Sequence, residues 1–231
     1  MILTTLYHYL NDFFRNGVLT HAPVTCRTEE SAPALGPGRS LFEHMTRGRP
    51  EIRAQQALYP HLCACYPQTR REWRYQNTFI DFWIPGADGQ DVAIELKHYS
   101  PHQTRKLATL LGPSKKRHFN LVADYEKPRP AGSVLIQIGL YTAVEDLDRS
   151  APKTYSSVPF VKSYVRRPVP PSRYEPLARD DLRNWSHLSN YVTPAGPATP
   201  ADFVVPSGPH VFGTQGNMVT GRVPFLLLVA R

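Results

Sequence analysis

The chain contains few cysteines and no long apolar run, and each shortage argues against a class of protein. Three cysteines among 231 residues, Cys26, Cys63 and Cys65, have no framework spacing, which predicts free thiols in a reducing, cytoplasmic setting. A zinc site from His61, Cys63 and Cys65 would lack a second ligand pair at recognisable spacing. The final apolar run, 225–229, is too short to cross a bilayer, and no cationic region precedes the N-terminal apolar residues. Neither a membrane partner nor a signal peptide is expected.

Several catalytic motifs are also missing from the sequence. We find no internal repeat, no Walker phosphate-binding loop, no dinucleotide fingerprint and no G-x-S-x-G. Interpretations as an NTPase or a serine hydrolase therefore have no residues to support them.

Basic residues and prolines are what the chain has in excess. Lysine and arginine number 27 against 19 acidic residues, which gives a formal net charge of +8 and a pI near 9.5. This balance suits a polyanionic partner such as DNA, although it would also serve solubility alone. The 23 prolines indicate long irregular connections and argue against an all-helical fold. With 41% hydrophobic residues, the chain is expected to form a single domain, 1–231, with a sizeable core.

The stretch 79–98 predicts a β-hairpin around which the other inferences are built. Residues on both sides of a turn signal at 85–89 alternate with period two, as strands with one buried face do. A three-residue loop, 87–89, with a left-handed Gly89, would set the register. The expected cross-strand pairs are Gly86 with Gln90, Ile84 with Val92, and Asp81 with Glu95.

This register has a chemical consequence at Asp81 and Glu95. Their carboxylates would stand side by side, with Cβ atoms roughly 5 Å apart, and like charges in that position destabilise a sheet. A divalent cation between them would remove the repulsion, and carboxylates with a backbone carbonyl are ligands that magnesium takes. Lys97 could act on a metal-bound water or stabilise negative charge at a phosphorus centre. The alternative is a surface hairpin in which Glu95 and Lys97 form a solvated face.

The spacing of Asp81, thirteen further residues and then Glu95-Leu96-Lys97 resembles the PD-(D/E)XK nuclease superfamily, which has the restriction-endonuclease-like fold. Ile80 stands where the motif has proline. The resemblance implies an α/β (α+β) fold, a central mixed β-sheet flanked by helices, here with Pro-rich loop embellishments. It implies that Asp81 and Glu95 bind Mg²⁺, with Mn²⁺ as a substitute, that the Leu96 carbonyl is a further ligand, and that Lys97 acts on the attacking water.

The same resemblance implies an acidic residue on the helix before the hairpin. A helix is expected from Pro50 to Tyr59, ending at Pro60. Glu51 in its first turn is the candidate for this catalytic position, and Glu43 is the second choice. The alternative is that Glu51 only interacts favourably with the helix dipole.

Two basic segments are candidates for contact with nucleic acid. The first interleaves arginines with aromatic residues directly before the hairpin, a combination that suits phosphates and splayed bases, although a plain connecting hairpin would look alike. The second is either a phosphate clamp or a solvated loop. The candidate residues are Arg70, Arg71, Arg74, Lys115, Lys116 and Arg117.

The remaining elements are expected to complete a nuclease core of approximately 40–165. An N-terminal helix, 2–16, and a Pro-rich C-terminal extension, 168–231, would pack on that core. A helix should start at Leu41 after a capping box. Residues 133–147 fit a buried strand or a helix. Further strands are expected at 61–66, 119–125, 158–167 and 223–229.

The sequence therefore predicts a magnesium-dependent endonuclease that hydrolyses DNA, of a restriction, defence or related DNA-processing type. A homodimer would suit the cutting of both strands of a duplex. Two alternatives stay open. One is a nucleic-acid-binding or assembly protein without catalysis on the same fold, and the other is an RNA-cleaving or toxin nuclease.

Overall fold

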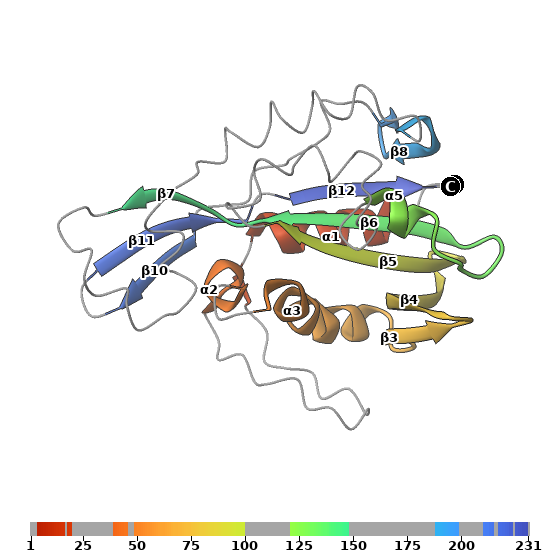
Figure 1. Cartoon of the computed structure of the whole chain (residues 1–231), viewed down its shortest axis with the longest axis horizontal. Helices are drawn as coiled ribbons and strands as arrows, with labels where there is room; N and C mark the ends of the chain where they lie inside the picture. The colour runs from red at the N-terminus through yellow and green to blue at the C-terminus, as the bar shows by residue number, and fades with distance from the viewer. Residues whose placement is uncertain are drawn as a thin grey trace.

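A mixed seven-stranded β-sheet with helices on both faces forms the centre of the protein (Figure 1). The computed structural model describes residues 4–16, 18–19, 39–45, 49–99, 121–147, 188–198, 210–214, 217–223 and 225–230. This architecture confirms the predicted α+β class. None of the helices in these ranges has the length and apolarity that crossing a membrane requires.

The central sheet has the strand order β3-β4-β5-β6-β12-β8-β9. Its strands are β3 (Arg70–Tyr75), β4 (Thr78–Ala87), β5 (Gln90–Tyr99), β6 (Val134–Tyr141), β12 (Phe225–Ala230), β8 (Tyr191–Thr193) and β9 (Gly196–Pro197). The pair β5–β6 is parallel and every other pair in the sheet is antiparallel. Since β12 pairs with both β6 and β8, the C-terminal end of the chain belongs to the sheet that carries the hairpin.

Two smaller sheets lie outside this centre. The strands β7 (Ala143–Leu147), β10 (His210–Thr214) and β11 (Asn217–Arg222) form an antiparallel sheet in the order β10-β11-β7, at the end of the molecule away from β8 in Figure 1. The second small sheet consists of β1 (Val18–Leu19) and β2 (Arg39–Ser40), which are antiparallel. A short 3-10 helix, η5 (Leu188–Asn190), precedes β8.

Three helices pack on one face of the central sheet. They are α1 (Thr4–Asn16), α2 (Leu41–Met45) and α3 (Pro50–Cys65), and their apolar residues share one core cluster with alternate residues of the strands. Residues of the sheet in this cluster include Phe82, Ile84, Val92, Ile94, Leu96, Ile136 and Ile138. The intervening residues of β5, Glu95 and Lys97, point to the other face, where α5 (Leu121–Tyr125) lies beside β6.

Helix α3 begins as predicted but continues past the predicted end. Pro50 occupies its first turn, where a missing N–H costs nothing. The expected end at Pro60 and the expected strand 61–66 are wrong, because α3 runs on through Pro60 to Cys65. Leu62 and Cys63 are buried against the sheet, and this packing outweighs the one hydrogen bond that a proline removes.

The hairpin matches the predicted register at its centre and differs at its turn. Ile84 lies opposite Val92 as expected, whereas Gln90 faces Ala87 rather than Gly86. The loop therefore has two residues, Asp88 and Gly89, which both have positive φ, as a type I′ turn requires. A register shift between Ile84 and Ala87 compensates for the shorter loop, at the site of a proline that cannot donate to the ladder.

The Asp88 carboxylate in this turn ties the hairpin to two helices. Its Oδ2 accepts a hydrogen bond of 3.0 Å from the Leu6 N–H in the first turn of α1. Its Oδ1 lies 3.4 Å from the Tyr66 hydroxyl at the end of α3. An acidic side chain at a helix N-terminus satisfies a free N–H and interacts favourably with the helix dipole.

The segments 133–147 and 119–125 can also be compared with their predicted secondary structure. Residues 133–147, which fitted either state, form β6 and β7. The strand predicted at 119–125 is wrong, because Leu121–Tyr125 is helical. Seven residues are too few for period-two alternation to decide, so packing against β6 determines the local structure. The strand predicted at 158–167 and most of the extension 168–231 lie outside the described residues.

We expect Phe225→Ala to lower the free energy of unfolding by about 3–5 kcal/mol, the usual cost of emptying a buried aromatic position. The Phe225 side chain is fully buried, and its ring centroid lies 5.5 Å from that of Phe14 in α1. Urea unfolding followed by circular dichroism would measure the change. The matched control is Phe79→Ala, which removes the same side chain from a position that is 59% exposed and should cost less than about 1 kcal/mol. Equal losses in both variants would contradict the placement of β12 in the core.

Candidate functional site

The candidate site begins where β4 and β5 separate. The ladder between these strands ends with Phe82 opposite Ile94, so Asp81 and Glu95 are the next residues beyond the last pair. The backbone N–H of Leu96 instead donates to Asp81 Oδ2 at 2.7 Å. A side-chain carboxylate thus replaces a backbone acceptor, which satisfies a strand N–H that would otherwise lack a partner.

The pairing of β4 with β3 is also irregular at Asp81. The register between the two strands omits the pair Glu72–Asp81, although it includes the pairs on both sides. Glu72 has a φ of 47°, a left-handed conformation that non-glycine residues rarely adopt. Such strain often marks functional sites. At Asp81, the pairing of β4 is therefore interrupted on both sides, toward β3 and toward β5.

Glu51 reaches the site from the first turn of α3. Its Oε2 accepts a hydrogen bond of 3.3 Å from the His98 N–H, and its Oε1 lies 3.8 Å from Lys97 Nζ. Glu51 and Asp81 therefore accept from the N–H groups of alternate residues on β5. The helix-dipole alternative is compatible with this position, because the residue lies at the N-terminus of α3.

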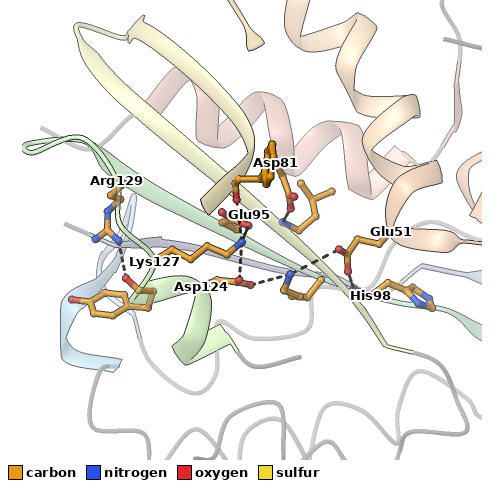
Figure 2. A network of polar contacts seen from close by, with 11 residues as sticks. Glu51, Asp81, Glu95, His98, Asp124, Lys127 and Arg129 are labelled. Atoms are coloured by element: carbon orange, nitrogen blue, oxygen red, sulfur yellow. Dashed lines mark hydrogen bonds and ion pairs between the residues drawn. The ribbon is translucent and has the colours of Figure 1, made fainter. Parts of the chain in front are cut away.

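Asp124 in α5 and Lys127 just after this helix add two further charged side chains to the site. Figure 2 shows the Lys127 side chain reaching from the end of α5 toward Glu95, with Asp124 beside it. Lys127 Nζ lies 2.6 Å from Glu95 Oε2 and 3.1 Å from Asp124 Oδ1. The other Asp124 oxygen, Oδ2, lies 3.3 Å from Lys97 Nζ. The two ammonium groups are thus joined through one buried carboxylate.

The site holds more negative than positive charge. Four carboxylates, from Glu51, Asp81, Glu95 and Asp124, face the ammonium groups of Lys97 and Lys127. With every group ionised, two negative charges would be unmatched. Burial, followed by the charges of Asp81 and Asp124, raises the pKa of Glu95 to about 9 against the opposing pull of Lys127.

The other charged groups respond in the directions that this imbalance dictates. Burial is the main cause of the raised pKa values of Asp81 and Glu51, and the positive charge of Lys97 opposes both. The pKa of Lys97 is raised although burial alone would lower it, because Asp124 and Glu51 outweigh the loss of solvent. Lys97 therefore carries a proton at neutral pH.

His98 adds a neutral polar group next to these charges. Burial lowers the pKa of its imidazole to about 3. Its Nε2 lies 3.2 Å from Thr142 Oγ1, on the short connection between β6 and β7. The side chain is thus held uncharged by its surroundings and contributes no positive charge to the site at neutral pH.

The donor chemistry of the site fits a hard divalent cation, whereas its present arrangement holds ammonium groups. Carboxylates of Asp81, Glu95 and Asp124 are the ligand class that Mg²⁺ takes, and unmatched negative charge is what a cation would neutralise. Within the described ranges, no three or more His, Cys, Asp or Glu groups surround one point in the geometry of a metal centre. Lys127 Nζ lies between two of these carboxylates instead.

The predicted nucleic-acid-binding arginines of the first segment lie on β3, an edge strand of the central sheet. Arg70 and Arg74 are exposed. The Arg71 guanidinium lies over the Tyr59 ring of α3, 5.7 Å from its centroid. Trp73 stacks on Trp83 with ring centroids 4.7 Å apart. Aromatic packing therefore fixes the strand, while two of its three arginines face solvent.

The structure brings together four residues that the sequence singled out: Asp81, Glu95, Lys97 and Glu51. The Leu96 side chain is buried in the core on the opposite face of the sheet, and its backbone N–H donates to Asp81 Oδ2. The side chain of Glu43 and the segment with Lys115, Lys116 and Arg117 lie outside what the structure describes.

Sequence reasoning missed Asp124, Lys127 and His98. Asp124 and Lys127 are three residues apart, the spacing of an ion pair on one helical face, and that was the available signal. The signal was hidden by the expectation of a strand at 119–125. His98 directly follows Lys97, and nothing in the sequence indicates that its imidazole would lie beside Thr142.

We expect the metal-free protein to lose stability as the pH rises from 7 to 9. The folded chain holds a proton on Glu95 up to a pKa of about 9, whereas the unfolded chain releases it near 4.5, so the folded state binds more protons in this range. The free energy of unfolding should fall by at most about 1.4 kcal/mol per pH unit for one proton. Urea titrations in EDTA would measure the slope. Glu95→Gln should flatten it, and an unchanged slope in that variant would assign the proton to another group.

Comparison of the chain with protein-family models, with curated proteins and with solved structures finds no match. What the protein does has to follow from the side chains described above.

Proposed function

We propose that this protein is a metal-dependent endonuclease that hydrolyses DNA phosphodiester bonds. The observation that carries the proposal is the convergence of Asp81, Glu95 and Lys97 at the point where β4 and β5 separate. This is the set of residues through which the sequence resembles the PD-(D/E)XK nucleases, and the mixed sheet with flanking helices is compatible with their fold. A role in restriction, defence or related DNA processing suits a chain of this kind.

Asp81 and Glu95 would hold the metal ion, Mg²⁺ or Mn²⁺, with the Leu96 carbonyl as a further candidate ligand. When bound, such an ion lowers the pKa of water and neutralises charge on a phosphate. Both carboxyl groups are largely buried, so solvent would screen little of the attraction between them and a divalent cation. A cation would therefore gain more there than at a surface pair of carboxylates. Binding at Glu95 would release the proton that the metal-free protein holds there below a pKa of about 9.

Lys97 would act as a fixed positive charge rather than as a base. Its ammonium is protonated, since Asp124 and Glu51 raise its pKa. A buried ammonium held 3.3 Å from Asp124 Oδ2 and 3.8 Å from Glu51 Oε1 is oriented before any substrate arrives. Such a preorganised cation stabilises the negative charge that develops on a phosphate during hydrolysis. Glu51 then serves as a positioning residue for Lys97.

The DNA backbone would approach from the side of β3. Arg70 and Arg74 are exposed on this strand, and β3 pairs directly with β4, which carries Asp81. Phe79, two residues before Asp81, is 59% exposed and offers a flat apolar surface near the site. Guanidinium groups suit phosphates, and an exposed aromatic ring suits a base that has left its stack.

A second candidate function is supported by one contact. Lys127 Nζ lies 2.6 Å from Glu95 Oε2, which neutralises in part the carboxylate that the metal would need. On this alternative the protein binds nucleic acid without cutting it, and the charged group serves the fold. The metal dependence of cleavage separates the two functions.

We expect the purified protein to nick or linearise supercoiled plasmid in Mg²⁺ or Mn²⁺ and to be inactive in EDTA. Asp81→Asn, Glu95→Gln and Lys97→Met should each lower the cleavage rate by about 100-fold or more, because each removes charge from the reacting centre. Single-stranded DNA and RNA tested in parallel would define the substrate. Agarose electrophoresis of the products gives the rates.

Glu126→Gln is the matched control for the carboxylate variants. Glu126 lies beside Asp124 in sequence but is exposed, so the same change of charge should leave cleavage unaltered. Binding of DNA without cleavage by a folded wild-type protein, in every metal tested, would favour the binding-protein alternative.

The double variant Arg70→Gln/Arg74→Gln should bind DNA more weakly and with a smaller dependence on salt. Each phosphate contact that is lost lowers the slope of log K against log salt by about 0.9. Fluorescence anisotropy in EDTA, from 50 to 200 mM salt, would measure the slope without cleavage. Arg15→Gln, at the end of α1, removes one positive charge far along the chain and should leave the slope unchanged. If both variants behave alike, the arginines of β3 do not contact DNA.

A further inference from the structure

The Lys127 ammonium is surrounded by three oxygen atoms. Glu95 Oε2 lies at 2.6 Å, Asp124 Oδ1 at 3.1 Å and the Phe79 carbonyl oxygen at 3.4 Å. Figure 2 shows the ammonium at the meeting point of the Glu95 and Asp124 side chains. Two carboxylates and a backbone carbonyl are the oxygen ligands that a hard divalent cation takes in proteins. A charged group of the chain itself therefore occupies a position suited to such an ion.

The backbone around Lys127 holds the residue at this position. The Lys127 N–H donates to the Asp124 carbonyl at 3.3 Å, which turns the chain at the end of α5. Two residues on, Arg129 Nη1 donates to the Tyr125 carbonyl at 2.7 Å. The backbone at Lys127 is thus fixed, whereas rotation about the four side-chain bonds would allow the ammonium to leave the three oxygens.

The two lysines of the site differ in how readily they could leave it. The side chain of Lys127 is 26% exposed and that of Lys97 is 11% exposed. Asp124, 3% exposed, carries one carboxylate oxygen, Oδ2, that makes no hydrogen bond in the described structure, with Lys97 Nζ 3.3 Å away. A buried oxygen in this state has capacity for a further cation.

We propose that Lys127 occupies the metal position of the metal-free protein, and that a divalent cation binds Glu95 by displacing the Lys127 ammonium toward solvent. Asp124 and the Phe79 carbonyl then become further ligands of the ion. This inference rests on the proposed function in that it concerns the same Glu95 carboxylate. It adds two ligands and an internal competitor that the PD-(D/E)XK motif itself does not contain.

Competition follows from charge, because a metal ion bound to Glu95 Oε2 would lie close to the Lys127 ammonium, which is 2.6 Å from that oxygen, and the two cations repel each other. The lysine stabilises the carboxylates while no ion is present, since without it Glu95 would lose its ion pair with Lys127 and Asp124 would keep only its pair with Lys97. A divalent ion brings twice the charge into the same oxygens and can offset the loss of that pair. Lys127 therefore sets the metal concentration at which the site fills.

The test is the affinity for Mn²⁺ of the wild-type chain and Lys127→Met, measured by isothermal titration calorimetry. Methionine has a similar length and no charge, so it removes the competitor and keeps the packing. We expect Lys127→Met to bind Mn²⁺ about tenfold more tightly or better, and to melt at a lower temperature than the wild type in EDTA. The control is Lys97→Met, which removes an equal charge that contacts Asp124 and Glu51 but not Glu95.

A second measurement uses the wild-type chain and so does not depend on how a variant folds. Lysine side-chain NMR during a Mg²⁺ titration should move the Lys127 signal toward that of a solvated ammonium, with a smaller change for Lys97. Lys127→Arg keeps the charge and should bind Mn²⁺ no more tightly than the wild type.

Three results would overturn the inference: equal Mn²⁺ affinity in the wild type and Lys127→Met, no binding to either, or an equal gain in Lys97→Met. The last would show general electrostatics without displacement. Failure of the proposed function is distinguishable, because metal could displace Lys127 in a protein that cuts no nucleic acid. Conversely, metal-dependent cleavage with an unchanged affinity in Lys127→Met would leave the nuclease proposal standing and remove this one.

Discussion

The hydrogen bond from the Leu96 N–H to the Asp81 carboxylate is the contact on which the candidate site depends. It forms where the ladder between β4 and β5 has ended, and it allows the two strands to diverge without leaving a buried N–H unpaired. Around this contact, the side chains of Glu51 from α3 and Asp124 from α5 approach Lys97 from two elements of the fold.

Charge balance is the second constraint, and it explains why so many ionisable groups share one face of the sheet. A lone buried carboxylate would be costly, and each of the four here has at least one ammonium or backbone N–H nearby. The balance remains incomplete, which raises the pKa of Glu95 far above that of a solvated glutamate. The sheet tolerates this because large apolar residues on its opposite face join a single core with α1, α2 and α3.

The sequence was informative where a pattern depends on neighbours along the chain, and less so where distant segments decide. Alternation over 79–98 predicted the hairpin and its central register, because side chains in a strand must alternate. The expected pair Asp81–Glu95 is absent from the ladder, which ends one pair earlier at Phe82 and Ile94. The turn was one residue shorter than predicted, because the pairing of the strands shifts between Ile84 and Ala87, beside a proline that cannot donate to the ladder. Asp124 was missed because five residues of helix are stabilised by packing on β6 rather than by their own propensity. Packing against the sheet likewise explains why α3 continues through Pro60 to Cys65.

The hairpin is also held differently at its two ends. At the turn, Asp88 joins it to α1 and to the end of α3, while at the other end Asp81 and Glu51 accept from the N–H groups of Leu96 and His98. The amide protons of these two residues can lose their acceptors through rotation of a side chain, whereas those within the ladder need the strands themselves to part. Their hydrogen-exchange rates would therefore report on the carboxylates of the site, separately from the unfolding of the sheet.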